Sequence, residues 1–293
     1  QLMGDAAPAV RAAAVEGICR ILNTFWELVP APTTAAFLAK LVDDLARDAA
    51  ASGVRAAVLE GLTRLVDNPL AQPVLKAVLP RLSPLIGDGA GRVRVAMADL
   101  LLAVKSVRSL HYYDVVPLED ILLALGGGGG AALAGRLTRL LAPTYLPLGK
   151  EPSEVVRRLT ALTARDADAA AALCRHAVKE GMPVTHASGV CRALAARLSV
   201  GTFGNNNDDD NGGDKAQKSA KGRRKHAEAT AQDKEGAEEP LTTPEWVAAA
   251  AARAELAAAI RDAPASARAQ AEEEAAAAAD NDEEDATTTT TTT

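Results

Sequence analysis

One twelve-residue pattern occurs three times, as VRAAAVEGICRI at residues 10–21, VRAAVLEGLTRL at 54–65 and VRVAMADLLLAV at 93–104. The copies align without gaps and begin at residues 10, 54 and 93, so they lie 44 and 39 residues apart. In each copy, apolar residues stand four, eight and eleven positions after the first Val, and these positions share one face of an α-helix. This pattern predicts stacked helical pairs that together bury one continuous core.

An acidic residue lies six or seven positions before the Arg of each copy. Asp in a turn between two helices can cap the second helix, and the Arg one turn in can reach the Asp of its own or of a neighbouring repeat. The pattern resembles the HEAT consensus, in which stacked Asp and Arg side chains form a ladder. The predicted ladder residues are Asp5 and Arg11, Asp48 and Arg55, and Asp88 and Arg94. Glu16 with Arg20, and Glu60 with Arg64, also have the spacing of i,i+4 ion pairs.

The segments that precede these turns have the three-to-four spacing of outer helices. Outer helices are predicted at residues 33–47 and 70–86, and Pro80 and Pro84 should kink or shorten the second. Further pairs are predicted at 115–125 with 131–141 and at 154–163 with 167–180, and the Gly126–Gly130 run predicts an expanded loop. The predicted fold class is all-α, a HEAT/armadillo-like α-solenoid over residues 1–200, followed by a disordered low-complexity C-terminal region.

The composition changes abruptly after residue 200. Residues 201–242 predict a disordered charged linker, 243–279 an Ala-rich helical segment with a thin apolar stripe, and 280–293 a low-complexity tail. A basic patch within the linker is a candidate nuclear-import signal or DNA-phosphate contact. Its residues are Lys218, Lys221, Arg223, Arg224 and Lys225. The alternative is that the patch is merely a solvated part of the linker.

The overall composition favours packed helices over a β-sandwich. Hydrophobic residues make up 48% of the 293 residues but aromatic residues only 3%, so Ala, Leu and Val supply the core. No apolar run is long enough to span a bilayer. The net charge of −6 does not demand a nucleic-acid partner. Scattered cations could still line a DNA-facing edge of the solenoid: Lys40, Arg47, Arg64, Lys76, Arg81, Lys105 and Arg108.

The sequence shows no pattern of an enzyme or a metal site. Three cysteines without a C-x-x-C motif argue against a disulfide framework or a zinc ribbon and favour a reducing compartment. The spacing of Cys174, His176, His186 and Cys191 fits no common zinc pattern. No histidine is followed by Glu, as an iron-dependent hydroxylase on a HEAT scaffold would require, and no phosphate loop or nucleophile elbow occurs. We therefore predict no catalytic residue, cofactor, metal or small-molecule substrate.

Stretches that link the repeats carry more specific information than the repeats themselves. They are FWELVP at 25–30, LVDDLARD at 41–48, LVDNPL at 65–70, VKSVR at 104–108 and YYDVVPLE at 112–119. Together with the repeats, these stretches resemble the G-type HEAT-repeat subunits of condensin II over roughly residues 5–185. The glycine run and the region beyond about residue 200 depart from the family pattern, and the chain, which does not begin with Met, is expected to be a fragment.

The resemblance implies a non-catalytic scaffold in the nucleus. Its expected partners are the kleisin subunit and the other condensin II subunits, including the SMC ATPase pair, with chromosomal DNA as a further candidate and no membrane. The expected role is support of mitotic chromosome condensation. The alternative is a generic HEAT or armadillo scaffold, such as a nuclear transport receptor or a phosphatase scaffold, which has no reason to carry the link at residues 105–119.

Overall fold

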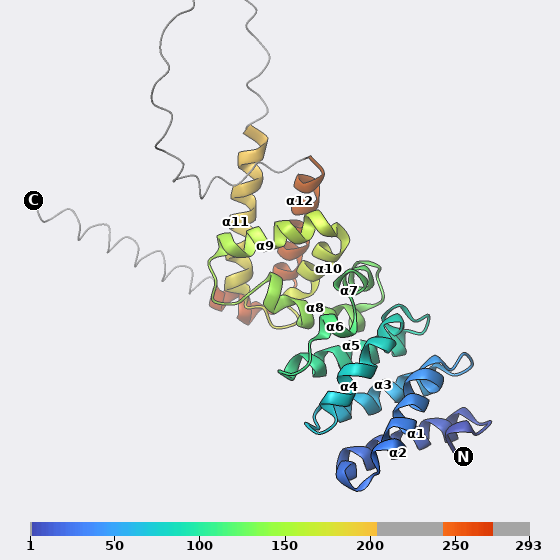
Figure 1. Cartoon of the computed structure of the whole chain (residues 1–293). Helices are drawn as coiled ribbons and strands as arrows, with labels where there is room; N and C mark the ends of the chain where they lie inside the picture. Colours follow the sequence, from blue (N-terminus) through green and yellow to red (C-terminus); the bar gives the residue numbers. More distant parts are fainter. Residues whose placement is uncertain (1, 204–242, 272–293) are drawn as a thin grey trace, which may run out of the picture.

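The computed structural model describes residues 2–203 and 243–271, and within these ranges every regular element is a helix. After a 3₁₀ turn, η1 (Leu2–Gly4), the helices stack one after another into an elongated, curved body. The N-terminal helices lie at one end, and helices α9 to α12 lie together at the other (Figure 1). The predicted all-α solenoid is confirmed.

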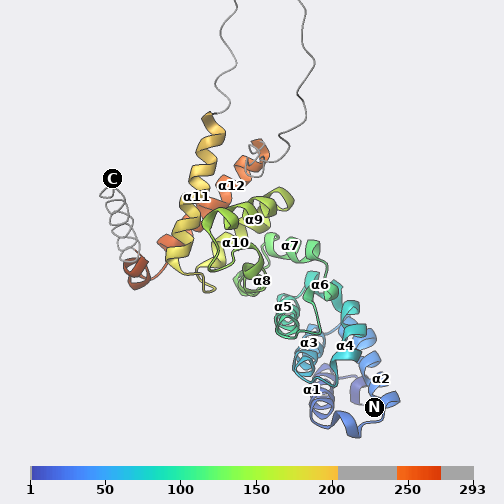
Figure 2. The same ribbon diagram turned by 60° about the vertical axis from the view of Figure 1, so that its left-hand side comes forward.

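One layer of the body consists of long helices that lie side by side. They are α1 (Pro8–Phe25), α3 (Ser52–Val66), α5 (Gly91–Ser106), α8 (Ala131–Tyr145) and α10 (Ala167–Ala177), and each packs against the next. The first three run as a row with the shorter outer helices beside them (Figure 2). Proline at the first or second position of α1 fixes a helical φ and removes an N–H that would have no intrahelical partner.

The outer layer is shorter and less regular. It consists of η2 (Trp26–Leu28), α2 (Ala31–Ala39) continued by the π-helical η3 (Lys40–Asp44) and the 3₁₀ η4 (Leu45–Arg47), α4 (Gln72–Val78) with the 3₁₀ η5 (Leu79–Gly87), α6 (Tyr112–Val115), α7 (Leu118–Gly126) and α9 (Pro152–Arg165). As predicted, the α-helix at 70–86 is shortened. It ends at Val78 because Pro80 and Pro84 lack the N–H groups that α-helical hydrogen bonds require.

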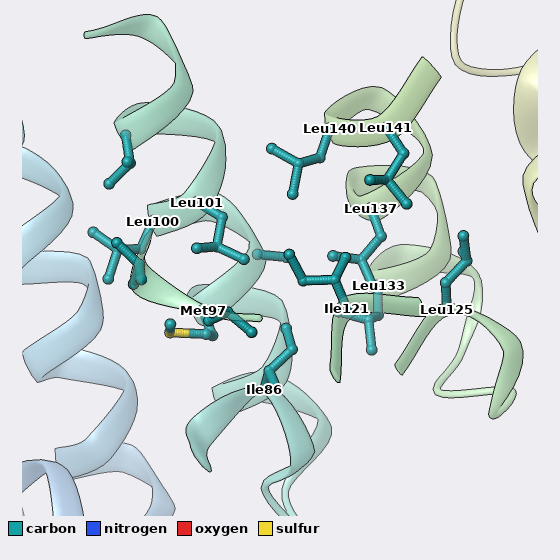
Figure 3. Packing of buried hydrophobic residues seen from close by; sticks show 14 of the residues in the cluster. Ile86, Met97, Leu100, Leu101, Ile121, Leu125, Leu133, Leu137, Leu140 and Leu141 are labelled. Atoms are coloured by element: carbon teal, nitrogen blue, oxygen red, sulfur yellow. The ribbon is translucent and has the colours of Figure 1, made fainter. Parts of the chain in front are cut away.

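The apolar columns of the second and third copies form the core between units. Val54, Val58, Leu62 and Leu65 are fully or almost fully buried, and so are their counterparts in α5. Figure 3 shows how this core continues into the next units, where Leu101 of α5 points toward Ile121 of α7 and Leu137 of α8. Neighbouring pairs of helices therefore share one cluster of buried side chains.

The first copy departs from this prediction. Val10, Ala14 and Ile18 are only partly buried, and Ile21 is 50% exposed. Helix α1 instead buries Val15, Cys19 and Leu22, the side that faces α3. The physical reason is that a helix in this layer needs a unit on both sides, and within the described residues nothing but η1 and part of α2 lies against the outer side of α1.

A further helical pair is formed by segments far apart in the sequence. Helix α11 (Val184–Phe203) packs against α9, whereas α12 (Thr243–Arg261) packs against α10 and α11 and so takes the next place in the inner layer. Small residues of α12, Ala248, Ala249 and Ala252, are buried and let the helices approach closely. The segment at 243–261 is therefore part of the helical body, and residues 204–242 connect the two members of a pair.

Candidate interaction surfaces

Two Arg–Asp ion pairs connect consecutive units along the turns. Arg11 Nε and an Nη of Arg11 donate to Oδ2 of Asp48 at 3.0 and 2.6 Å. Arg55 donates to both carboxylate oxygens of Asp88 at 2.8 Å. The side chains of Arg55 and Asp88 are only 14% and 9% exposed. Each pair joins an Arg in one inner helix to an Asp in the turn before the next inner helix, and we call these two pairs the rungs.

Each arginine also binds the turn of its own unit. Arg11, Arg55 and Arg94 donate to the backbone oxygens of Asp5, Asp48 and Asp88, at 2.8, 2.6 and 3.1 Å respectively. A guanidinium has five N–H donors in a fixed fork, so one arginine can hold two units at once. Each of the three arginines therefore donates to a backbone carbonyl of its own unit. Arg11 and Arg55 also donate to a carboxylate of the next unit.

The aspartates hold the turns, but they are not the N-cap residues that we expected. The N-cap positions of α1, α3 and α5 are Ala7, Ala51 and Ala90, and their side chains make no cap hydrogen bond. Oδ1 of each preceding Asp instead accepts from the N–H of these alanines, at 2.8 to 2.9 Å. The extra turn residue before α3 adds a bond from the N–H of Ala50 to Asp48. A true side-chain cap occurs at α10, where Asp166 accepts from Ala169.

The hydrogen bonds at the rungs shift the pKa values of the groups that form them. Desolvation alone would raise the pKa of Asp48 and Asp88, but hydrogen bonds from Arg11 or Arg55 and from the turn N–H groups outweigh it, so both pKa values lie below the usual Asp range. The hydrogen bond to Asp88 raises the pKa of Arg55. Both partners are therefore held in their charged forms.

A second row of ion pairs crosses between units, and our sequence reasoning misplaced it. The predicted pairs within helices, Glu16 with Arg20 and Glu60 with Arg64, do not form among the described residues. An Nη of Arg64 instead lies 3.7 Å from a carboxylate oxygen of Glu16, in the preceding unit. Arg136 of α8 likewise donates to Asp99 of α5 at 2.5 Å. The acidic and basic positions that recur in the repeats do form ion pairs. The partners, however, lie in neighbouring units and not one turn apart in the same helix.

Several cations proposed for a DNA-facing edge already contact neighbouring groups of the solenoid. Lys40 pairs with Asp44 at 2.6 Å, and Arg81 pairs with Asp43 at 2.5 Å. Lys105 Nζ donates to the backbone oxygens of Arg139 and Leu140 in α8, and desolvation there lowers its pKa. Lys40, Arg81 and Lys105 therefore already have partners within the solenoid. The basic patch at Lys218, Lys221, Arg223, Arg224 and Lys225 lies outside the described residues.

The cysteines and histidines near the C-terminal end of the solenoid serve packing. Burial raises the pKa of the Cys174 thiol and, to a lesser extent, that of Cys191, whose Sγ lies 3.9 Å from the backbone oxygen of Arg253. Desolvation lowers the pKa of His176 and His186. Within residues 2–203 and 243–271 no group of three His, Cys, Asp or Glu is placed to hold a metal ion. None of the helices in these ranges is long and apolar enough to cross a membrane.

An apolar surface remains open on the outer side of α1. It is lined by Leu2 and Met3 of η1, by Val10, Ile18 and Ile21 of α1 and by Phe37 of α2. In the second and third units, the same columns are covered by neighbouring helices. This surface therefore has the chemistry of an internal contact between units.

Paired helices, a shared core and rungs between consecutive units define the class of this protein as an all-α helical solenoid. Its sequence is similar to that of Condensin-2 complex subunit G2 from several vertebrates. The mouse protein is 36% identical over 154 residues, which is 53% of this chain and 13% of the relative. The Xenopus laevis protein is 32% identical over 182 residues, 62% of this chain and 16% of the relative, and the human protein is 34% identical over 154 residues.

These matches confirm the predicted resemblance to the condensin II G-type subunit. The chain spans between 13% and 16% of the length of the relatives that it matches. No family model matches the chain, and no solved structure gives a significant match.

Proposed function

We propose that this chain is a scaffold segment of a condensin II G-type subunit, without catalytic activity of its own, that binds the kleisin subunit and supports mitotic chromosome condensation in the nucleus. The observation that carries the proposal is the similarity to four Condensin-2 complex subunit G2 proteins at 31–36% identity. The HEAT-like rungs between units support it, because they favour a fixed curvature. A preformed curved surface can bind an extended peptide with little ordering of its own.

The links between repeats favour this proposal over a generic scaffold. A transport receptor or phosphatase scaffold would need the same apolar columns, but not the particular sequence around Tyr112 and Tyr113. In the structure these two rings pack edge to face at 5.5 Å between centroids, and Tyr113 is 54% exposed. Exposed aromatic side chains are frequent in protein interfaces, so the link offers a surface for a partner within the complex.

A chimera tests the proposal in the setting of a whole subunit. The segment of the mouse relative that matches this chain is replaced by the matching residues of this chain, and the chimera is co-expressed with mouse kleisin. We expect the kleisin to co-purify with the chimera as it does with the unaltered mouse subunit. A chimera that carries an unrelated α-solenoid segment of equal length serves as the control.

The comparison between the two chimeras decides the outcome. If the chimera with this chain has a cooperative thermal transition but recovers no more kleisin than the control, the proposal is wrong. A direct pull-down supplements the assay, with this chain as bait and the C-terminal kleisin segment or its scrambled version as prey. Enrichment of the native over the scrambled segment supports kleisin binding by this segment itself.

A further inference from the structure

The series of rungs stops at Arg94. Arg11 and Arg55 each reach a carboxylate in the next turn, but the turn that follows α5 and α7 contains Gly126–Gly130 and no acidic residue. Arg94 makes the own-unit contact to the backbone oxygen of Asp88, as the other two arginines do. Its Nε, however, is buried without a hydrogen-bond acceptor, and no carboxylate of the described residues forms an ion pair with it. A buried charged donor without an acceptor is costly, because it has lost water without gaining a partner.

A cavity lies over this guanidinium. Its volume is about 350 Å³, and its walls come from Pro84 and Ile86 of η5, Leu123 of α7 and Leu133 of α8. The glycine loop adds no side chain to this space, and a Cβ on Gly129 would stand at contact distance, 3.6 Å, from Arg94 Nε. Gly128 and Gly130 have φ of 70° and 96°, a backbone conformation that favours glycine. The loop therefore passes over the arginine without side chains that could fill the space.

We propose that this cavity binds an acidic peptide segment of a partner protein, with an Asp or Glu carboxylate on Arg94 and a neighbouring aliphatic side chain against Leu123 and Leu133. The chain itself shows which ligand suits the position, because in two preceding units the equivalent arginine holds a carboxylate. Leu123 is 70% exposed and forms an apolar rim. The guanidinium fork suits a carboxylate that accepts two parallel N–H bonds.

The surroundings favour a peptide over a nucleic acid or a phosphate. Arg94 is the one cation that lines the cavity, and the exposed Asp120 lies on its wall without an ion pair to Arg94. A phosphomonoester carries more negative charge than a carboxylate and would be repelled more strongly by Asp120, whereas the phosphodiester of a nucleic acid carries the same single charge as a carboxylate. The apolar walls also match an aliphatic side chain better than a sugar-phosphate backbone. The same reasoning predicts that Asp120→Asn tightens binding of the peptide.

The direct test uses a peptide that copies a rung of this chain. The probe is the acetylated and amidated octapeptide of residues 84–91, PLIGDGAG, which presents Asp88 beside Leu85 and Ile86. The ¹⁵N-labelled full chain is titrated with it, and the Arg94 Nε–Hε signal and the Gly129 amide are followed by NMR. We expect both signals to shift to saturation. The same peptide with Asn in place of Asp should bind at least about tenfold more weakly, because it loses a hydrogen bond to a charged group.

Variants separate the cavity from the general charge of the chain. Arg94→Gln should abolish the shift of the Gly129 amide, whereas Arg92→Gln, an exposed site two residues away with the same change in charge, should leave it unchanged. Gly129→Asp should supply the missing carboxylate from within the chain and weaken peptide binding at least tenfold relative to Gly129→Asn. These two variants are compared with each other because either Cβ must displace Leu133 Cδ2, which lies 2.7 Å away.

Three results would overturn the proposal. They are an Arg94 Nε–Hε signal that does not move with the Asp peptide, equal affinities for the Asp and Asn peptides, and equal binding by Gly129→Asp and Gly129→Asn. The titration needs no kleisin, so its outcome is independent of the chimera assay. A chimera that recovers kleisin together with a silent Arg94 would leave the condensin proposal intact and remove only this site.

Discussion

The rung between Arg55 and Asp88 should stabilise the solenoid far more than an exposed ion pair does. The perturbation is a double-mutant cycle with Arg55→Met, which keeps much of the aliphatic stem, and Asp88→Asn, which keeps an oxygen to accept from Ala90. The control is the same kind of cycle on Lys40 and Asp44, an i,i+4 pair. Both pairs have short contacts, at 2.8 and 2.6 Å, so distance does not distinguish them.

Burial sets the expected magnitudes. The side chains of Lys40 and Asp44 are 41% and 56% exposed, and such pairs couple by about 0.3–0.5 kcal/mol. At the rung the exposed fractions are 14% and 9%, and Arg55 binds both carboxylate oxygens of Asp88. Breaking a buried pair costs about 3–5 kcal/mol because the remaining charge is left without a partner. For this partly buried rung we expect Arg55→Met alone to cost about 2–3 kcal/mol and the coupling energy to be about 1.5–2.5 kcal/mol.

Urea denaturation followed by circular dichroism measures each cycle, with four chains per pair. The slope of unfolding free energy against urea must stay the same across a cycle, so that differences in midpoint report stability. A coupling energy at the rung no larger than that of Lys40 and Asp44 would contradict a stabilising role of the rung. It would mean that the solenoid is held by its apolar columns alone and that the rungs only accompany them.

Three further predictions concern columns shared by the repeats. Leu65→Ala should lower the unfolding free energy by about 2–5 kcal/mol. Ile21→Ala, in the same column, should lower it by less than about 1 kcal/mol because Ile21 is 50% exposed. Equal losses in urea denaturation would show that the outer side of α1 is covered in solution. Gly17→Ala should raise the unfolding free energy by about 0.5–1 kcal/mol, since nothing lies within 4 Å of the new Cβ. Gly61→Ala should lower the unfolding free energy by about 1–3 kcal/mol, because its Cβ would lie 2.5 Å from Cys19 Sγ. Calorimetry that gives both variants a change of the same sign would contradict this prediction. The carboxylates of the two rungs have folded-state pKa values below the ordinary Asp value, so their contribution is fully present above pH about 4 and is lost as the pH falls through the lowered values. The unfolding free energy should therefore drop more steeply below pH 4 for the native chain than for one with both aspartates changed to Asn, and parallel curves would count against the rungs.

The period, the helical faces and the positions of the turns could all be predicted from local sequence patterns. Three copies of one apolar stripe predicted the all-α stack, since a repeated helix that cannot bury its stripe alone does so against the neighbouring repeats. The prolines at 80 and 84 also act locally, because a missing N–H shortens an α-helix wherever it lies. The links between repeats carried the resemblance to condensin II, which the similar proteins confirm.

The partner that each repeated residue contacts depends on how the units stack, and no local pattern predicts it. The sequence allowed Arg55 to bind Asp48 or Asp88, and stacking gives it the backbone oxygen of the first and the carboxylate of the second. The first apolar stripe is exposed because burial depends on a neighbouring unit, not on the helix that carries the stripe. Helix α12 packs on α10 across a long separation in sequence, and Arg94 lacks a carboxylate because a glycine loop stands where the next aspartate would be. Local pattern fixes what a segment can form, whereas contacts between segments far apart depend on the arrangement of the whole stack.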